Sequence, residues 1–161
     1  DVIYSESVKV TQKFNACIII DFRTGGSPDD TITVKFDKYT PGGVYKSSFT
    51  DEMVHKNATL YYYQTGTGKY VITVSKPQCV TRVYEVNVDK KDVNLDVNIT
   101  VLYDVNMDGV VNVIDATLVQ KQVVHNVEFD SYQLKLADTD NDGTISVVDA
   151  TNIQKKIVSL L

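Results

Sequence analysis

The sequence has little cysteine and no long apolar run, and each shortage excludes a class of protein. Cys17 and Cys79 are the only cysteines, and because they do not form a Cys-x-x-Cys pair, a zinc site is not expected. They could pair in an extracellular protein, or Cys17 could remain a buried free thiol, since Ala16 and residues 18–20 beside it are apolar. No stretch approaches the roughly eighteen apolar residues of a membrane-spanning helix, so no membrane partner is expected.

The sequence also lacks the short motifs typical of common catalytic sites. It contains no Gly-x-Ser-x-Gly, no phosphate-binding Gly-Lys-Ser/Thr loop and no His-Glu-x-x-His. Its two histidines, His55 and His125, are far apart in the sequence, and we expect His55 to be a solvated loop residue. The clustered carboxylates fall in the loops described below, which leaves little support for a glycosidase acid/base pair. The sequence therefore predicts a protein that is not an enzyme.

The beginning of the chain and the distribution of charge bear on location and partners. Residues 1–4 show neither an initiator methionine nor a basic-then-apolar signal pattern, so we interpret the chain as part of a longer, exported, extracellular protein. Residues 1–100 contain twelve acidic and twelve basic residues, whereas residues 101–161 contain nine acidic residues and four lysines. The whole net charge of −5 therefore lies in the C-terminal part. This placement argues against nucleic acid, whose phosphates require a basic surface, and suits divalent cations.

The first hundred residues have the pattern of a β-protein. Segments rich in β-branched and aromatic residues alternate with turns such as Pro41-Gly42-Gly43. Residues 93–101, for example, place an apolar side chain at every second position. We predict strands at residues 8–10, 17–22, 31–36, 60–63, 70–75, 80–88 and 93–101. Roughly seven short strands indicate an all-β, immunoglobulin-like sandwich over residues 1–101.

Near residue 102 the strand pattern stops, and a repeat with a period of 34 residues begins. Residues 104–126 align with residues 138–160, and ten of the 23 aligned positions are identical. Each copy is an Asp-rich loop followed by a helical pattern of about ten residues. The helices have apolar stripes that should pack together, at Ala116, Val119 and Val123 in the first copy and at Ala150, Ile153 and Ile157 in the second. Asp130 is expected to cap a short connecting helix through Ala137, so residues 102–161 are predicted to form a small all-α domain.

The two Asp-rich loops, residues 104–115 and 138–149, have the spacing of EF-hand-type calcium loops. Such loops supply oxygen ligands from positions 1, 3, 5, 7, 9 and 12 around a glycine at position 6. The predicted ligands are Asp104, Asn106, Asp108, Val110, Asn112 and Asp115 in the first loop and Asp138, Asp140, Asp142, Thr144, Ser146 and Asp149 in the second, with backbone carbonyls from Val110 and Thr144. Position 12 is Asp rather than Glu in both loops, and no helical pattern precedes the first. The matched pair predicts two Ca²⁺ ions.

A tandem of loop and exiting helix, with Asp at position 12 and no entering helix before the first loop, resembles a dockerin. Dockerins are docking modules of cellulosome-type assemblies that degrade polysaccharides, and they bind cohesin modules on scaffold or cell-surface proteins. The stretch Asp115-Ala116-Thr117-Leu118-Val119-Gln120-Lys121 is similar to clostridial and ruminococcal dockerins. The preceding β-region resembles, in residues 70–77 and 81–86, the X module that accompanies some dockerins, and also carboxypeptidase-regulatory-like sandwiches. The resemblance implies a calcium-dependent docking protein whose β-domain stabilises its dockerin.

The same resemblance implies which residues contact cohesin. The family's contact positions fall on Val113, Ile114, Thr117, Gln120, Lys121, Val124 and His125 in the first repeat, and on Val147, Val148, Thr151, Gln154, Lys155, Val158 and Ser159 in the second. Spacing supports part of this set, because Ile114, Thr117, Lys121 and Val124 form one helical stripe opposite the predicted core stripe. Many type I dockerins have Ser-Thr where this chain has Val113-Ile114, which argues against a type I partner and predicts a more hydrophobic contact.

Two other functions compete with docking. Tyr61, Tyr62 and Tyr63, in a chain with ten tyrosines and no tryptophan, could present an aromatic surface for sugars. The β-domain would then be a carbohydrate-binding or adhesion module with a calcium-stabilised tail. Alternation sends Tyr62 to the face opposite Tyr61 and Tyr63, so any polysaccharide contact is expected to be weak. A calmodulin-like switch requires paired entering and exiting helices that open a groove, and the missing entering helix argues against it.

Overall fold

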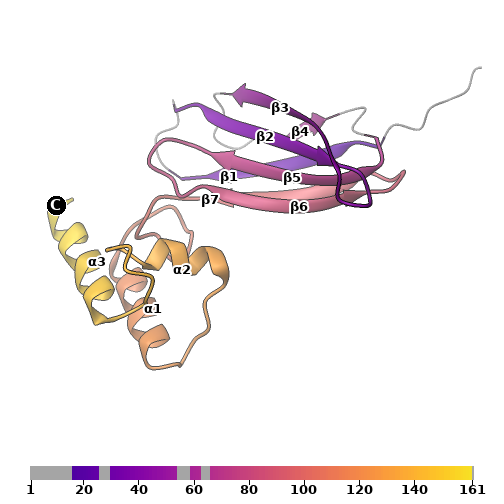
Figure 1. Cartoon of the computed structure of the whole chain (residues 1–161). Helices are drawn as coiled ribbons and strands as arrows, with labels where there is room; N and C mark the ends of the chain where they lie inside the picture. The colour runs from indigo at the N-terminus through magenta and orange to yellow at the C-terminus, as the bar shows by residue number, and fades with distance from the viewer. Residues whose placement is uncertain (1–15, 26–29, 54–58, 63–65, 161) are drawn as a thin grey trace, which may run out of the picture.

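The computed structural model describes residues 16–25, 30–53, 59–62 and 66–160. The strand predicted at residues 8–10, and also His55 and Tyr63, lie outside these ranges. Figure 1 shows two regions, a β-region that ends with the strand labelled β7 and a helical region that follows it. No helix in the described ranges has the length and apolar character needed to cross a membrane.

The β-region consists of two sheets that lie one over the other (Figure 1). The smaller sheet has the order β4 (Thr59–Tyr62), β1 (Ile18–Thr24), β7 (Val93–Ile99). The larger sheet has the order β3 (Tyr45–Met53), β2 (Ile32–Tyr39), β5 (Gly68–Ser75), β6 (Arg82–Val88). Among these strands, neighbours are antiparallel except β1 and β7, which run parallel and in register from Ile18 and Val93 to Thr24 and Ile99.

Alternating apolar residues explain which faces of the strands are buried. In β5, every second side chain from Tyr70 to Val74 is buried, while the residues between them are half-buried. Apolar side chains from both sheets belong to one core cluster. The largest fully buried members in the β-region include Tyr70, Phe36, Ile18, Ile20, Ile32, Ile72 and Ile99. The prediction that this part of the chain is rich in β-structure is confirmed.

The two sheets, with the orders β4-β1-β7 and β3-β2-β5-β6, show how the described strands pair. The immunoglobulin-like character of the sandwich stays a prediction, because the first strand predicted for it, at residues 8–10, lies outside the described residues. Strand and turn signals are local, but the pairing of β1 with β7 joins Ile18 to Val93, and no local pattern specifies a contact at that separation.

The sequence pattern also does not predict β3. Its residues from Tyr45 to Glu52 are all exposed, and most of them are polar, so no alternation of buried apolar side chains marks the strand. Among the described strands β3 pairs only with β2, which makes it an edge strand of the larger sheet. Polar edge strands of this kind are held by backbone pairing rather than by burial, and charged side chains on them discourage association with other edges.

The helical region contains α1 (Val113–Val123), α2 (Ser131–Ala137) and α3 (Val147–Ser159). Each helix begins with a capping box, in which the N-cap side chain accepts a hydrogen bond from the N3 backbone N–H and the N3 side chain accepts one from the N-cap backbone N–H. The N-cap residues are Asn112, Asp130 and Ser146. The connecting helix predicted between Asp130 and Ala137 is therefore confirmed as α2.

α1 and α3 pack against each other through the predicted apolar stripes. Ala116, Val119, Ala150 and Ile153 are buried, whereas Val123 and Ile157, at the ends of the stripes, are half-buried. Small alanines near the start of each helix allow close approach of the two backbones. α2 adds Tyr132, Leu136 and Ala137 to the same core cluster.

The two cysteines lie at opposite ends of β1. Cys17 precedes the strand and its thiol is 3.6 Å from the carbonyl oxygen of Ile18, whereas the thiol of Cys79 is 3.5 Å from the carbonyl oxygen of Gly25, just after the strand. Both are free thiols, so the pairing that the sequence left open is not formed in this structure. Burial raises the pKa of each thiol, so neither is activated as a nucleophile.

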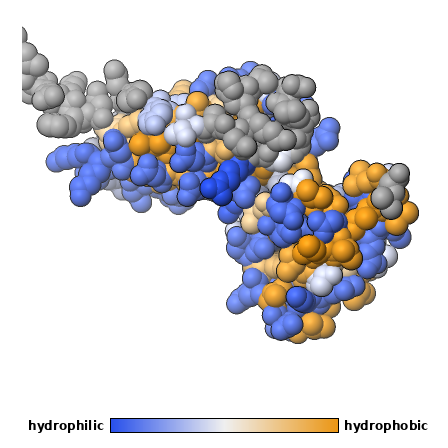
Figure 2. Space-filling view, turned by 180° about the vertical axis from the view of Figure 1, so that it is seen from behind, coloured by the Kyte–Doolittle hydropathy of each residue, from blue (hydrophilic) through white to orange (hydrophobic). Residues whose placement is uncertain are grey.

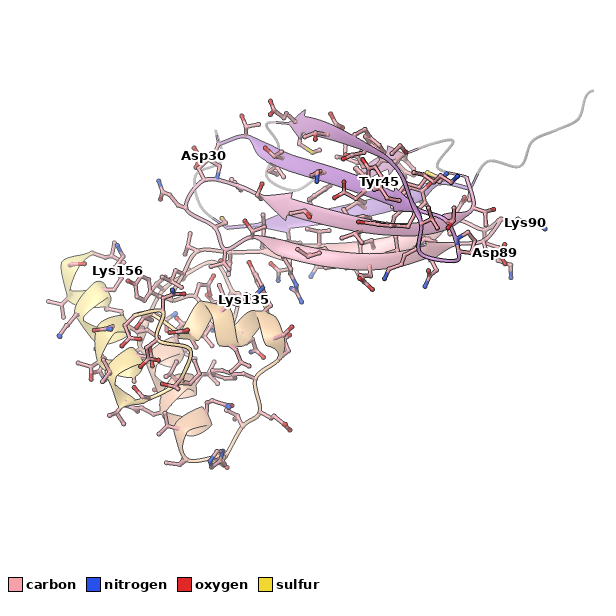
Figure 3. All side chains as sticks on the ribbon, in the orientation of Figure 1. Asp30, Tyr45, Asp89, Lys90, Lys135 and Lys156 are labelled. Atoms are coloured by element: carbon pink, nitrogen blue, oxygen red, sulfur yellow. The ribbon has the colours of Figure 1, made fainter. Side chains whose placement is uncertain are left out.

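The helical region joins the β-region at one end of the sheets. In Figure 3 the turn that carries Asp89 and Lys90 lies at the far end of the sheets, away from Lys135 on α2 and Lys156 on α3. Figure 1 shows α2 as the helix beside the junction, with α1 and α3 extending away from the sheets. The faces of α1 and α3 that do not pack together are therefore left uncovered by the strands.

Candidate functional site

The first predicted calcium loop is organised around Asp104, its residue at position 1, which is fully buried. Asp104 Oδ1 accepts a hydrogen bond from the N–H of Asp108 (3.2 Å), and Oδ2 accepts one from the N–H of Gly109 (2.9 Å). The hydroxyl of Thr100, which precedes the loop, also donates to Oδ2. The loop therefore turns back over the carboxylate of Asp104.

Asp115, at position 12, closes the first loop and is also fully buried. Its Oδ1 accepts from the N–H groups of Val105 (2.9 Å) and Asn106 (3.1 Å), and its Oδ2 accepts from that of Asn112 (2.8 Å). Burial raises the pKa of the Asp115 carboxyl and the charge of Asp104 raises it further, while the backbone hydrogen bonds lower it. The net direction is upward, so this carboxylate would be stabilised by a nearby cation.

The second loop brings three carboxylates together. One oxygen from each of Asp138, Asp140 and Asp149 lies within 4.8 Å of the others. Because calcium binds oxygen at about 2.4 Å, two oxygens on one ion can be at most about 4.8 Å apart. This spacing, and the hard oxygen chemistry of the donors, therefore fit one Ca²⁺ ion.

Asp149 closes the second loop as Asp115 closes the first. It is fully buried, its Oδ1 accepts from the N–H (2.8 Å) and the hydroxyl (3.0 Å) of Thr139, and its Oδ2 accepts from the N–H of Ser146 (2.8 Å). Burial raises the pKa of Asp149, but the hydrogen bonds from Ser146 and Thr139 outweigh burial, so the net pKa is lowered. The pKa values of the two position-12 carboxyls are thus shifted in opposite directions, upward for Asp115 and downward for Asp149.

No basic side chain in the described ranges neutralises the loop carboxylates. The ion pairs that the structure describes lie elsewhere, between Lys35 and Asp37, Lys69 and Glu85, and Arg82 and Asp130. Buried charges in proteins are normally paired or coordinate a metal. The buried carboxylates of Asp104, Asp115 and Asp149, with half-buried Asp138, therefore have the character of cation ligands.

The backbones of the two loops match at the positions that matter for the turn. Gly109 and Gly143, both at position 6, have φ values of +91° and +84°. A Cβ at either position would meet no atom within 4 Å, so glycine is required for the left-handed backbone and not for space. Met107 and Asn141, both at position 4, also share a φ of +58°. The loops are therefore two copies of one conformation.

Other predicted ligands are engaged within their loops. Asp142 lies outside the group of three carboxylates, and its Oδ1 accepts from the N–H and the hydroxyl of Thr144, both at 2.7 Å. In the first loop, the Asn106 side-chain nitrogen donates to Asp108 Oδ2 (2.8 Å), and the Val110 carbonyl accepts from the Asn112 side chain (3.2 Å).

The position-9 residues serve as helix caps in this structure. Asn112 Oδ1 accepts from the N–H of Ile114 (2.8 Å), and Ser146 Oγ accepts from the N–H of Val148 (3.0 Å). A side-chain oxygen used as a cap is turned toward the helix, and position 9 of such loops often binds calcium through water. We therefore expect both residues to contribute through a water molecule.

All the predicted docking residues are exposed on α1, on α3 or just beyond their ends. Matched positions have nearly the same exposure: 64% for both Val113 and Val147, 53% for Ile114 and 50% for Val148, and 70% for both Val124 and Val158. The polar members are also exposed: Thr117, Gln120, Lys121, His125, Thr151, Gln154, Lys155 and Ser159. In Figure 2, apolar side chains gather on the helical region, whereas the β-region presents a mostly hydrophilic surface in that view.

Residues 102–158 match the family model of the dockerin type I domain. We call this stretch the dockerin segment. Dockerin type I domains are non-catalytic modules that bind calcium and dock onto cohesin modules, and no catalytic family matches the chain. They occur in cellulosome components that are secreted or bound to the cell surface. The match supports the predicted non-catalytic docking role for residues 102–158. Within this stretch, Val113-Ile114 and Val147-Val148 are apolar where many type I dockerins have Ser-Thr. No curated protein and no solved structure gives a significant match.

The dockerin segment is attached to the β-region through the side chain of Tyr132, a contact that sequence reasoning did not identify. The Tyr132 hydroxyl donates to the carbonyl of Val80 (2.7 Å) and accepts from the N–H of Thr100 (3.0 Å). Burial of the ring raises the pKa of Tyr132 to about 12, so the hydroxyl stays protonated and can donate. The sequence around Asp130 predicts the start of a helix, but no local pattern indicates which part of the β-region Tyr132 contacts.

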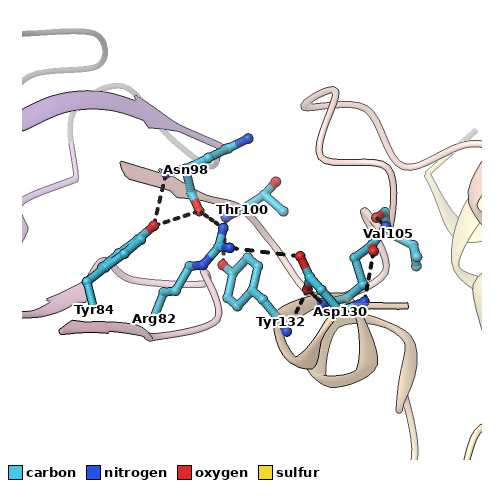
Figure 4. A network of polar contacts seen from close by, with 8 residues as sticks. Arg82, Tyr84, Asn98, Thr100, Val105, Asp130 and Tyr132 are labelled. Carbon is cyan, nitrogen blue, oxygen red and sulfur yellow. Dashed lines mark hydrogen bonds and ion pairs between the residues drawn. The ribbon is translucent and has the colours of Figure 1, made fainter. Parts of the chain in front are cut away.

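Arg82 completes the contact between the two regions (Figure 4). Its guanidinium donates to the carbonyl of Asn98 (3.0 Å) and lies 4.0 Å from the carboxylate of Asp130, the N-cap of α2. The guanidinium carbon lies 5.3 Å from the ring centroid of Tyr84 and 4.5 Å from that of Tyr132. Arg82 on β6 thus contacts both β7, a strand of the smaller sheet, and the start of α2.

Proposed function

We propose that the dockerin segment is a docking module that binds two Ca²⁺ ions through its two loops and binds a cohesin module of a scaffold or cell-surface protein through α1 and α3. In this proposal it anchors its extracellular parent protein to a cellulosome-type assembly. The observation that carries the proposal is the matched exposure of apolar residues at corresponding positions of the two repeats, together with the family match.

The docking face follows from what the helices bury and what they leave exposed. Each helix buries one stripe, at Ala116 and Val119 or at Ala150 and Ile153, in the core of the segment. Each then presents a second apolar group on its outer side, such as Val113 and Val147, that nothing in the described structure covers. Exposed apolar patches with a polar rim are typical of protein interfaces, and here the rim includes Lys121 and Lys155.

Calcium is proposed to hold the loops in the shape that starts these helices. The residues that would hold the ions are the carboxylates at positions 1 and 12 of each loop, with the intervening Asp and Asn side chains and the carbonyls of Val110 and Thr144. Bound calcium would supply the positive charge that balances buried Asp104 and Asp115. Asp115 and Asp149 are also the N3 residues of their capping boxes, so ligand position and helix start are set by the same side chain.

The β-region is proposed to be an X-module-like domain, spanning residues 1–101, that stabilises a dockerin domain of residues 102–161. The hydrogen bonds of Tyr132 to Val80 and Thr100, and the contact of Arg82 with Asp130, support this role. The short link between β7 and Asp104 supports it as well, because Thr100 and Tyr103 are both hydrogen-bonded to α2.

A carbohydrate-binding β-domain has less support than docking. Tyr62 and Phe49 pack around Phe36, with ring centroids 4.4 Å from Phe36 in both cases, and the Tyr62 hydroxyl bonds to Asp51 (3.1 Å). These rings are therefore used within the fold, although Tyr61 is exposed. A calmodulin-like switch has less support too, because α2 precedes the second loop but β7 leads to the first.

The experiment that tests the proposal is a pull-down against an array of cohesins, with the chain in calcium and in excess chelator. We expect a cohesin to be retained in calcium only, and the circular dichroism of the helices to fall in chelator while the β-sheet signal persists. Affinity electrophoresis in plant polysaccharides serves as the comparison. Retention by a polysaccharide and by no cohesin would favour the carbohydrate-binding alternative, and unchanged helix content in chelator would contradict a structural role for calcium.

A further inference from the structure

The two position-1 aspartates are held differently, although their loops share one backbone conformation. Among the described residues, the donors to Asp138 in the second loop lie within that loop: they are the N–H groups of Asp142 (3.1 Å) and Gly143 (3.0 Å). Asp104 accepts the equivalent two bonds and a third from the hydroxyl of Thr100, outside the loop. The residue that corresponds to Thr100 in the second repeat is Leu134, which has no hydrogen-bond donor in its side chain.

Thr100 is itself fixed by the β-region and by α2. It is 2% exposed, its carbonyl accepts from the N–H of Val80 (2.8 Å), and its N–H donates to the Tyr132 hydroxyl (3.0 Å). Gly25, at the end of β1, packs so closely that a Cβ there would lie 2.6 Å from the Thr100 hydroxyl oxygen. The position of this hydroxyl therefore depends on how the β-region is folded and docked.

The hydroxyl determines how the Asp104 carboxylate is turned. Oδ2 takes two donors, Thr100 and Gly109, whereas Oδ1 takes one longer bond from Asp108. With Oδ2 fully engaged, Oδ1 is the oxygen with capacity left for another partner. Groups that hydrogen-bond a metal ligand from behind hold its orientation, and their loss typically weakens metal binding by about 10- to 100-fold.

We propose that Thr100 is a positioning residue through which the docked β-region strengthens calcium binding at the first loop and leaves the second loop unaffected. The inference rests on the proposed calcium function of the loops. Because coupling between two equilibria is reciprocal, calcium at the first loop should tighten the attachment of the β-region to α2 by the same factor.

The test is a calcium titration of the full chain followed by two-dimensional NMR, in which the amide signals of Gly109 and Gly143 report the two loops separately in one sample. Thr100→Val removes the hydroxyl and keeps the shape of the side chain. We expect it to weaken calcium binding at Gly109 by about 10-fold or more and to leave the titration at Gly143 unchanged. Thr100→Ser keeps the hydroxyl and should titrate at Gly109 as the unaltered chain does.

A second variant keeps the proposal testable if Thr100→Val folds poorly. Tyr132→Phe leaves the Thr100 hydroxyl in place but removes the phenolic oxygen that holds the Thr100 amide, so calcium binding at Gly109 should weaken and that at Gly143 should not. Amide exchange of Thr100 in the unaltered chain should slow when calcium is added, as the reciprocal coupling requires.

Other outcomes would contradict either the role of Thr100 or the calcium function on which it rests. If Thr100→Val and Tyr132→Phe leave Gly109 unchanged, or weaken Gly109 and Gly143 equally, then Thr100 does not position the first loop. If Thr100→Ser weakens binding as much as Thr100→Val, packing and not the hydroxyl is responsible, and the proposal is also wrong. If neither glycine of the unaltered chain responds to calcium, the proposed calcium function itself fails.

Discussion

Arg82 on β6 lies over the ring of Tyr132 on α2, with its guanidinium carbon 4.5 Å from the ring centroid. The pair crosses the junction between the β-region and the dockerin segment, and the Tyr132 hydroxyl reaches past it to Val80 and Thr100. A cation over an aromatic face stabilises by about 0.5–2 kcal/mol, depending on burial. The junction is therefore a packed and hydrogen-bonded contact, and we expect it to contribute to the stability of the helices.

Tyr132→Phe should lower the melting temperature of the dockerin segment in calcium. The change leaves the buried Thr100 N–H without its partner, which costs about 1–3 kcal/mol, and also removes the partner of the half-buried Val80 carbonyl. Lys69→Ala is the matched control, because it removes the exposed ion pair with Glu85, and exposed pairs contribute about 0–1 kcal/mol. Thermal unfolding followed by circular dichroism would measure both.

Removing the β-region should have a larger effect than Tyr132→Phe. A fragment of residues 101–161 loses Val80, Arg82 and Thr100 together, along with the apolar surface that the β-region shares with α2 through one core cluster. We expect a lower melting temperature and, through the first loop, a weaker response to calcium. A fragment with an unchanged melting temperature would show that the β-region does not stabilise the dockerin segment.

When calcium is chelated, the charges of the two position-12 aspartates should contribute differently to the stability of the helices. The pKa of Asp115 is raised, so its contribution to stability is present below its ordinary pKa and is lost as pH rises through the folded pKa. The pKa of Asp149 is lowered, so its contribution is present above its ordinary pKa and is lost as pH falls through the folded pKa. At pH 7 in chelator, Asp115→Asn should therefore destabilise the helices less than Asp149→Asn.

The comparison is matched because both oxygens of each carboxylate accept hydrogen bonds from the loop. Replacing either residue with Asn removes one acceptor in both cases, so that cost cancels when the two variants are compared. The helix content that remains in chelator, followed by circular dichroism at pH 7 and pH 5, would provide the measurement. Equal destabilisation at both pH values would contradict the different electrostatic settings of the two carboxylates.

The second loop should bind calcium more tightly than the first. It offers four carboxylates, whereas Asn106 replaces one of them in the first loop, and ligand charge is one determinant of affinity. Three of the four, on Asp138, Asp140 and Asp149, already have oxygens close enough to share an ion. Calorimetry on Asp115→Ala and Asp149→Ala, each of which leaves the other loop intact, would rank the sites, and equal affinities would refute the ranking.

The dockerin segment should bind one cohesin in two orientations. Matched positions on α1 and α3 have nearly equal exposure, and the β-region attaches through α2 and the first loop, which leaves both outer faces open. Two of the seven matched positions differ: Ile114 against Val148, by one methylene group worth about 0.8 kcal/mol when buried, and His125 against Ser159. A half-turn of the segment should therefore present almost the same surface.

The measurement uses two pairs of substitutions on a cohesin that the chain binds. Ile114→Asp with Lys121→Glu alters α1, and Val148→Asp with Lys155→Glu alters α3. Each pair alone should reduce affinity only slightly, because the other helix can bind, and the two pairs together should abolish it. Loss of binding from one pair alone would establish a single orientation and identify the helix that carries it.

The dockerin segment could be predicted closely from the sequence because its information is local. Ligand spacing, a glycine at position 6 and a cap such as Asp130 act within a dozen residues, and a second copy repeats them. Local bonding also explains what spacing could not show: Asn112 and Ser146 have their oxygens turned toward the helices as caps. A ligand position in the sequence does not determine where its side chain points.

The β-region was less predictable because its pairings are distant. Alternation located strands such as β5, whose buried face is apolar, but β3 is exposed and its polar sequence carries no such signal. The contact between the β-region and α2 could not be predicted for the same reason, because Tyr132 and Val80 are 52 residues apart in the sequence. Contacts of this kind depend on how separately formed elements are brought together.

The parallel pairing of β1 with β7 bears on mechanical load. The two strands point the same way, so tension between residue 18 and residue 99 pulls them past each other along their length. Seven residue pairs, from Ile18 and Val93 to Thr24 and Ile99, then bear the load together instead of separating one at a time. Single-molecule pulling from the N-terminal side against a docked partner should show the helices yielding before this ladder, and early rupture of the β-region would contradict that order. The β-region would then stay folded under tension and transmit the force to the dockerin segment.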